Sequence, residues 1–153
     1  MTPEQKLQAL GIELPACAAP VGAYVPAVRT GNLVITAGQL PMKDGSLTAV
    51  GKVPADVSVQ EAQFAARQAL LNALSALRAE IGSLDNVSRI VRLNVLVNST
   101  GGFTEQAQVA NGASDFLLEV FGDTGRHTRT AVGAAELPLN APVELDITAE
   151  INA

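Results

Sequence analysis

Cysteine and aromatic residues are scarce in this 153-residue sequence. Cys17 is the only cysteine, so no disulfide can form within the chain, and a reducing compartment is favoured. Tryptophan is absent and aromatic residues make up 3% of the chain, so the core gains less from burial per residue and contacts between subunits are expected to add stability. Apolar residues still reach 48%, which is enough for one sizeable core in one domain.

Charge and long apolar runs are limited as well. Charged residues make up 16% of the chain and the net charge is −5, which disfavours the basic surface typical of nucleic-acid binding. No run approaches the ~18 apolar residues needed to cross a membrane, and residues 1–6 lack the apolar stretch of a secretory signal. We therefore expect a soluble cytoplasmic protein whose weakly charged surface is partly covered in an oligomer.

Turn signals, helix caps and hydrophobic periodicity predict an α/β (α+β) domain with the order β-β-β-α-β-α-β-β. A helical extension over residues 1–20 precedes this domain, which spans residues 21–153. The predicted strands are 24–29, 33–37, 47–50, 89–99, 128–136 and 143–151, and the long helices are 58–82 and 104–120. Two helices can cover only one face of a mixed sheet. The other face needs a partner, most simply a second copy of the chain.

Two of the predicted elements carry distinctive patterns. The helix over 58–82 begins with the capping box Ser58–Glu61, and its alanine-rich face predicts a close approach to a neighbouring element. In the strand over 89–99, alternation places four residues toward the core: Val91, Leu93, Val95 and Val97.

Several kinds of site find little support in the sequence. One His and one Cys cannot supply the usual metal ligands, so we expect no bound metal. Cys17 and His127 could form a nucleophile–base pair, although a lone cysteine is more often an inert packing residue. The segment 99–102, Ser-Thr-Gly-Gly, precedes a helix and could hold an anion on its backbone amides, but a plain turn explains it equally well.

Arg129 is the most informative residue. It lies in a strand of small residues, and alternation places it on one face with Ala131 and Gly133, with space above the small side chains. A guanidinium beside such a patch suits bidentate capture of a carboxylate. The alternative is an arginine that pairs with Glu144 or Asp146 on a neighbouring strand, and the pattern alone does not decide between the two.

An ordered set of motifs resembles the RidA/YjgF family, also called the reactive-intermediate deaminase or L-PSP endoribonuclease family. The matching residues are Tyr24-Val-Pro-Ala-Val, residues 31–41, Asn111, Arg129-Thr-Ala-Val and Leu137-Pro138, and the similarity covers about residues 20–151. The resemblance implies a chorismate-mutase-like fold and a homotrimer with a pocket at each subunit interface.

The resemblance also implies an activity. Family deaminases hydrolyse enamines or imines, such as 2-aminoacrylate, to a 2-keto acid and ammonia without a cofactor. By analogy Arg129 binds the carboxylate of a small metabolite, Tyr24 and Asn111 line the pocket, and Glu144 orients or activates water. From the residues alone, Glu144 could equally form an ordinary ion pair, and Tyr24 could be a core or interface aromatic residue.

The sequence departs from the family pattern near the expected pocket. Ala37, Ala131 and Gly133 stand where a serine, a cysteine and an acidic residue are common, and these changes point to a roomier, less polar pocket of a longer-chain branch. His127 lies two residues before Arg129 and could face the same pocket, or an exposed loop. A non-catalytic metabolite-binding protein is the alternative function, and a ribonuclease is disfavoured by the acidic charge.

Overall fold

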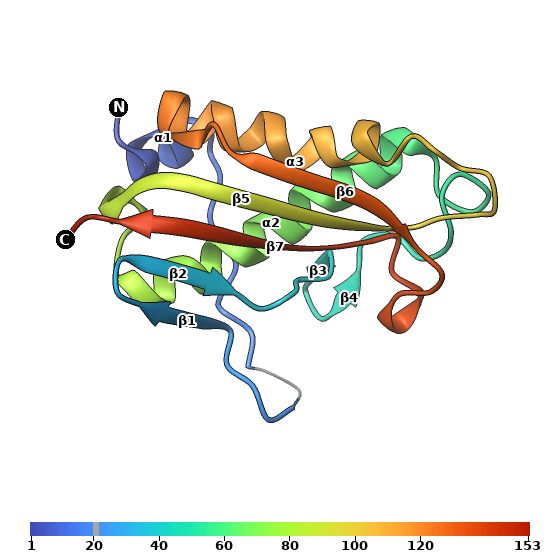
Figure 1. The fold of residues 1–153 in the computed structure, drawn as a ribbon, viewed down its shortest axis with the longest axis horizontal. Coiled ribbons are helices and arrows are strands. Elements are labelled where there is room, and N and C mark those ends of the chain that lie inside the picture. The colour runs from blue at the N-terminus through green and yellow to red at the C-terminus, as the bar shows by residue number, and fades with distance from the viewer. Residues whose placement is uncertain (20–21) are drawn as a thin grey trace.

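The computed structural model describes residues 1–19 and 22–153 and contains a five-stranded sheet with strand order β1-β2-β7-β5-β6 (Figure 1). The strands of this sheet are β1 (Ala27–Thr30), β2 (Leu33–Thr36), β5 (Val87–Asn98), β6 (Thr128–Ala134) and β7 (Val143–Ile151). The helices are α1 (Pro3–Ala9), α2 (Val59–Ile81) and α3 (Gln106–Phe121), with 3-10 turns at Leu84–Asn86, Gly122–Gly125 and Pro138–Asn140.

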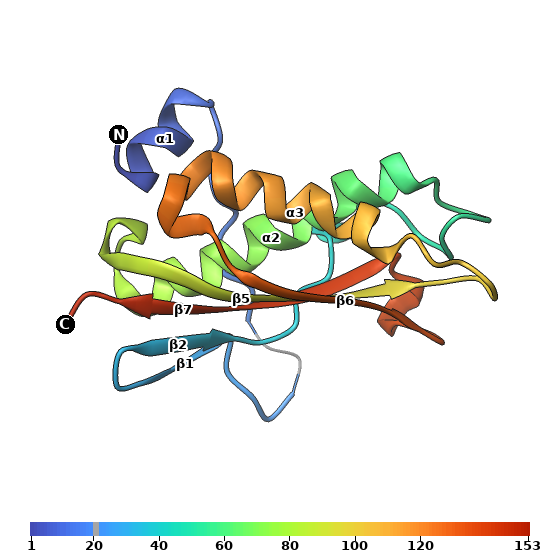
Figure 2. The ribbon, with the colours of Figure 1, turned by 45° about the horizontal axis from the view of Figure 1, so that its top comes forward.

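The sheet is mixed and is covered on one side. β5 and β6 run parallel, whereas the other pairs are antiparallel. Figure 2 shows α2 and α3 on the same face of the sheet, with α1 beside α3. The α+β class and the two helices on one face are therefore as predicted.

The predicted third strand does not join this sheet. Residues 47–50 were expected to form it, but β3 (Met42–Lys43) and β4 (Ser46–Leu47) instead make a separate two-stranded hairpin. The turn at Asp44-Gly45 between them has positive φ values of 53° and 82°. A two-residue turn of this kind joins its own two strands directly and leaves too little chain to reach the main sheet.

The alternation predicted for residues 89–99 is wrong at its beginning. Leu93, Val95 and Val97 are fully buried as expected, but Ile90 is also fully buried whereas Val91 is only half-buried. The register between β5 and β7 shifts between Ile90 and Arg92. A bulge adds one residue to a strand and reverses the faces on one side of it, which strict alternation does not foresee.

The helices α2 and α3 pack closely, as the alanine-rich face of α2 predicted. Ala62, Ala66, Ala69 and Ala73 are all fully buried. At Gly112 of α3, an added Cβ would lie 2.1 Å from the carbonyl oxygen of Gln63. Of the predicted capping box, the structure contains the bond from the Glu61 amide to Ser58 Oγ, at 3.1 Å.

Polar contacts attach the N-terminal segment to the rest of the fold. The Glu4 carboxylate accepts a hydrogen bond from the Leu84 amide at 2.9 Å and lies 3.2 Å from an Arg78 nitrogen. Further along, the Ser75 hydroxyl donates to the carbonyl of Pro15. Because these contacts accompany the buried Leu7, α1 is held against the helical layer.

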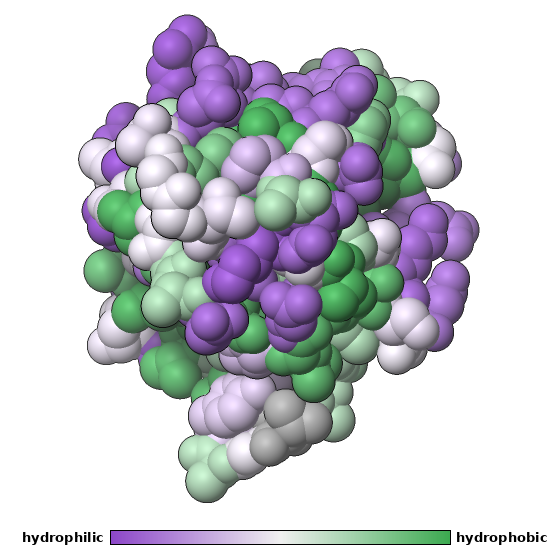
Figure 3. All heavy atoms as spheres, turned by 90° about the vertical axis from the view of Figure 1, so that its right-hand side faces the viewer, coloured by the Kyte–Doolittle hydropathy of each residue, from purple (hydrophilic) through white to green (hydrophobic). Residues whose placement is uncertain are grey.

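The uncovered face of the sheet carries exposed apolar side chains. Four of them are each 39–51% exposed: Val28, Leu33, Ile35 and Val132. Along their strands these residues alternate with residues that face the helices, so they point to the opposite side of the sheet. At the loop end of the molecule, Figure 3 shows hydrophobic and hydrophilic residues interspersed. Within the described residues, no helix has the length and apolar character needed to cross a membrane.

Gly112→Ala is expected to destabilise the fold by roughly 2 kcal/mol, because overpacking against the Gln63 backbone outweighs the gain in helix propensity. Chemical denaturation measures the change. Gly101→Ala is the control, since an added Cβ there has nothing within 4 Å. Equal stability of the two variants would contradict the close approach of the helices.

Candidate functional site

The Arg129 side chain lies beneath α3. In the parallel register of β5 and β6, Arg129 is the partner of fully buried Leu93, so its side chain points to the helix-covered face. Its Nη1 donates to Asn111 Oδ1 at 2.8 Å and to Ser114 Oγ at 3.1 Å. Asn111 and Ser114 are three residues apart on α3, and this spacing places both acceptors on one helix face.

His127 joins the same group through Ser114. Its Nε2 lies 2.9 Å from Ser114 Oγ, and its Nδ1 lies 2.7 Å from the carbonyl oxygen of Gly125. The structure therefore brings together three residues singled out in the sequence, Arg129, Asn111 and His127, and adds Ser114. His127 is half-buried, so the expectation of an exposed loop histidine is not met.

The Nε–Nη2 edge of the Arg129 guanidinium differs from Nη1 in its hydrogen bonding. Among residues 1–19 and 22–153, neither Nε nor Nη2 of Arg129 donates a hydrogen bond. The alternative ion pair with Glu144 or Asp146 is not formed, because β5 separates β6 from β7 and both acidic residues alternate with core residues on the opposite face. This leaves a planar pair of donors suited to a carboxylate.

The small residues beyond Arg129 provide less space than predicted. Ala131 is half-buried and packs against the hydrophobic core. At Gly133, an added Cβ would lie 3.1 Å from Ser99 Oγ and 3.2 Å from Gln106 Nε2. The predicted space above the small residues is thus filled at Gly133 by two polar side chains, which strand alternation cannot reveal.

Glu144 occupies the uncovered face of the sheet. It pairs with Leu96 of β5, and its neighbours on β7, Val143 and Leu145, are buried on the helix side. Partial burial and, to a lesser extent, the negative charge of Asp146 raise the pKa of the Glu144 carboxyl. A raised pKa lets such a carboxyl keep its proton at a higher pH than an ordinary glutamate, which favours a role in proton transfer.

Gly38 leaves room for the Glu144 carboxylate. An added Cβ at position 38 would lie 2.6 Å from Glu144 Oε1. The chain around this glycine is held by the two backbone bonds between Gln39 and Leu145, of 2.7 and 3.1 Å. Gly38 therefore determines how closely the carboxylate approaches the chain that follows β2.

Tyr24 lies near the other edge of the sheet. It precedes β1, is 50% exposed, and stands outside the strand that the sequence predicted to begin there. Since β1 and β6 are the two edge strands, Tyr24 and Arg129 are separated by the width of the sheet. One chain thus brings together Arg129, Asn111 and His127, but neither Tyr24 nor Glu144 joins them.

The structure also places the other motifs considered in the sequence. Cys17 is exposed and bonds weakly to the Ala18 carbonyl, whereas His127 bonds to Ser114, so the two do not pair. The segment 99–102 forms a turn, in which the Phe103 amide donates a hydrogen bond to the Thr100 carbonyl at 3.2 Å. Over the described ranges, no group of three His, Cys, Asp or Glu side chains is placed to hold a metal.

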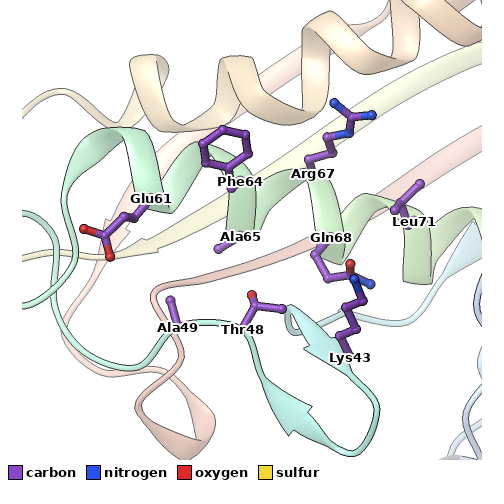
Figure 4. Close-up of a pocket in the computed structure, with 9 residues that line it drawn as sticks. All are labelled: Lys43, Thr48, Ala49, Glu61, Phe64, Ala65, Arg67, Gln68 and Leu71. Carbon is purple, nitrogen blue, oxygen red and sulfur yellow. The ribbon is translucent and has the colours of Figure 1, made fainter. Parts of the chain in front are cut away.

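Two surface hollows lie on the outer side of the helices. A groove of about 360 Å³ separates α2 from the β3–β4 hairpin, with Phe64 and Leu71 on one side and Lys43 on the other (Figure 4). A second hollow of about 160 Å³ lies between α2 and α3 and includes Asn111. Arg129 lines neither of these hollows, nor a third of about 600 Å³ beside α1.

Sequence reasoning missed Ser114 and the role of Gly38. The spacing of Asn111 and Ser114 is a signal that a helical projection would show. The proximity of Gly38 to Glu144 depends on the pairing of residues 106 positions apart, for which the sequence alone offers no sign.

Comparisons with known proteins cover nearly the whole chain. The model of a family described as YjgF/chorismate mutase-like candidate endoribonucleases matches residues 4–151. Protein TCP17 of Trypanosoma cruzi is 50% identical over 147 residues, which cover 95% of this chain and 92% of that protein. The 2-iminobutanoate/2-iminopropanoate deaminase of Escherichia coli is 33% identical over 131 residues, which cover 86% and 89%.

Solved structures show the same arrangement of elements. A candidate endoribonuclease from Shewanella oneidensis superposes with a TM-score of 0.95 at 38% identity, covering 99% of this chain and 100% of that one. TdcF of Escherichia coli, solved with bound serine, has a TM-score of 0.64 at 28% identity, covering 90% and 94%.

Glu144→Gln is expected to gain stability relative to the wild type as the pH rises from about 4 to 7. With a raised pKa, the carboxyl contributes stability that is fully present below its unfolded pKa and lost as the pH rises through its folded pKa. Denaturant unfolding at several pH values measures this difference. Glu13→Gln, at an exposed position in a loop, is the matched control. If the difference in unfolding free energy between the wild type and Glu144→Gln does not change with pH, the raised pKa is contradicted.

Proposed function

Because the chain belongs to the RidA/YjgF family, with its chorismate mutase-like fold, we propose that it hydrolyses small carboxylate-bearing enamines or imines to 2-keto acids. The observation that carries the proposal is the guanidinium of Arg129, which is held along Nη1 by α3 and keeps the Nε–Nη2 edge for a ligand. Relatives named as 2-iminobutanoate/2-iminopropanoate deaminases support the substrate class.

The proposed reaction needs orientation and a proton carrier. An enamine first tautomerises to the imine by gaining a proton on carbon and losing one from nitrogen. Water then adds to the imine carbon, and the C–N bond breaks to release ammonia and leave the carbonyl. Arg129 holds the carboxylate and so fixes the imine carbon. Glu144, whose raised pKa suits the task, takes a proton from water and returns one to the leaving nitrogen. The route uses no cofactor.

We further propose that each pocket is shared between copies in a homotrimer. In one chain Arg129 and Glu144 lie on opposite faces of the sheet, so a single copy cannot present both to one small substrate. The uncovered face, with exposed Val28, Ile35 and Val132, offers apolar surface for such an assembly. In this arrangement Arg129 of one copy meets Glu144 and Tyr24 of another.

Non-catalytic binding of a small metabolite is the second candidate function. It uses the same arginine, and the structure of TdcF with bound serine shows that a relative binds an amino acid. Binding without turnover would require that Glu144 stay away from the bound carbon. A ribonuclease is less favoured, because the net charge of −5 gives no basic surface for a phosphate backbone.

Arg129→Ala is expected to raise KM for 2-iminobutanoate by roughly 10- to 100-fold, because a charged hydrogen-bonded contact to the carboxylate is lost. The imine is generated in the assay by a threonine dehydratase, and release of 2-oxobutanoate is followed. Arg126→Ala is the control, since Arg126 is exposed and pairs with the exposed Asp123. Keto-acid release at the protein-free rate, across imines of several lengths, would rule out the hydrolase.

Mixed oligomers of Arg129→Ala and Glu144→Gln are expected to regain roughly a quarter of the wild-type activity after joint refolding. Equal mixing gives about that fraction of pockets an intact Arg129 from one copy and an intact Glu144 from the other. Activity that stays at the level of the separate variants would contradict the shared pocket. A molecular mass of one chain in light scattering would contradict the trimer.

A further inference from the structure

The hydrogen bonds around Arg129 form one continuous chain of donors and acceptors when the His127 ring is neutral. The carbonyl oxygen of Gly125 can only accept, so Nδ1 of His127 carries the hydrogen in their 2.7 Å contact. Nε2 of the neutral ring then accepts the hydroxyl hydrogen of Ser114 across 2.9 Å. The oxygen of Ser114 is left to accept from Arg129 Nη1 at 3.1 Å.

This chain saturates one nitrogen of the guanidinium. Nη1 has two hydrogens, and Asn111 Oδ1 and Ser114 Oγ accept one each. A carboxylate that binds the guanidinium side-on would then use Nε and Nη2, which donate to no acceptor among the described residues. Ser114 is 8% exposed, so its hydroxyl has little access to water and depends on these partners.

We propose that Ser114 and His127 are positioning residues that hold the Nε–Nη2 edge of Arg129 toward the substrate carboxylate, an inference that rests on the function proposed above. Neither side chain contacts the ligand in this arrangement. Ser114 sets the rotation of the guanidinium, and His127 sets the direction of the Ser114 hydroxyl. Without the acceptor at Nε2, that hydroxyl can turn its hydrogen toward Nη1 and repel it.

The matched variants His127→Asn and His127→Gln test the required acceptor. An Asn amide reaches only about as far as Nδ1, whereas a Gln amide reaches the place of Nε2 and can accept from Ser114. We expect His127→Asn and Ser114→Ala each to weaken binding of 2-oxobutanoate by about three- to tenfold, and His127→Gln to bind close to the wild type. Isothermal titration calorimetry measures Kd.

Two measurements distinguish a positioning role of Ser114 from a general effect on stability: the kinetics of Ser114→Ala, and a control variant at a second buried serine. Ser114→Ala should raise KM for 2-iminobutanoate and leave kcat unchanged, because a carboxylate anchor contributes equally to ground and transition states. Ser75→Ala is the control: Ser75 is 5% exposed and donates to Pro15, so its loss should lower stability and leave Kd unchanged. The double variant Ser114→Ala/His127→Asn should bind no more weakly than the weaker single variant.

The outcomes distinguish this inference from the proposed function. If Arg129→Ala binds 2-oxobutanoate as the wild type does, the proposed function fails. If Arg129→Ala abolishes binding while Ser114→Ala and His127→Asn retain wild-type Kd, only the positioning role fails. Equal losses in His127→Asn and His127→Gln, or additive losses in the double variant, would also overturn the positioning role.

Discussion

The parallel register between β5 and β6 determines which side of the sheet each candidate residue occupies. It sets Arg129 beside buried Leu93 and so turns the guanidinium toward α3, while Glu144 beside Leu96 faces away from the helices. A shift of one residue in β6 would reverse this, because strand side chains alternate. The side of the sheet on which a carboxylate can bind therefore depends on backbone pairing more than on any single side chain.

Placing the Arg129 guanidinium under a helix has a desolvation cost, which the polar residues of α3 offset. A half-buried cation needs acceptors in place of the water it loses, and Leu93, the partner of Arg129 on β5, supplies none from its side chain. Asn111 and Ser114 supply two neutral oxygens to one nitrogen. Neutral acceptors leave the positive charge uncompensated, which keeps it available to an anionic ligand, whereas a carboxylate partner would have neutralised it.

The sequence predicted most of the fold, and it singled out Arg129, Asn111 and His127, which the structure brings together. Local signals were sufficient for the cap at Ser58 and for the strand at 143–151, because these depend on neighbouring residues. The β-bulge after Ile90 and the separate β3–β4 hairpin depend on which strands pair. Arg129 stood out as a charge among small residues. Ser114 did not, because a serine in a helix acquires a role only through its tertiary partners.

The crossing of α2 and α3 connects the core to the guanidinium. Gly112, where α3 passes close to α2, directly follows Asn111, and the backbone of Gln63 fills the space a side chain would take. A helix held backbone-to-backbone at this point has little freedom to translate or rotate. The height of the Asn111 and Ser114 acceptors above β6 is then a property of the core packing, so a change that separates the two helices also moves the anchor for Arg129.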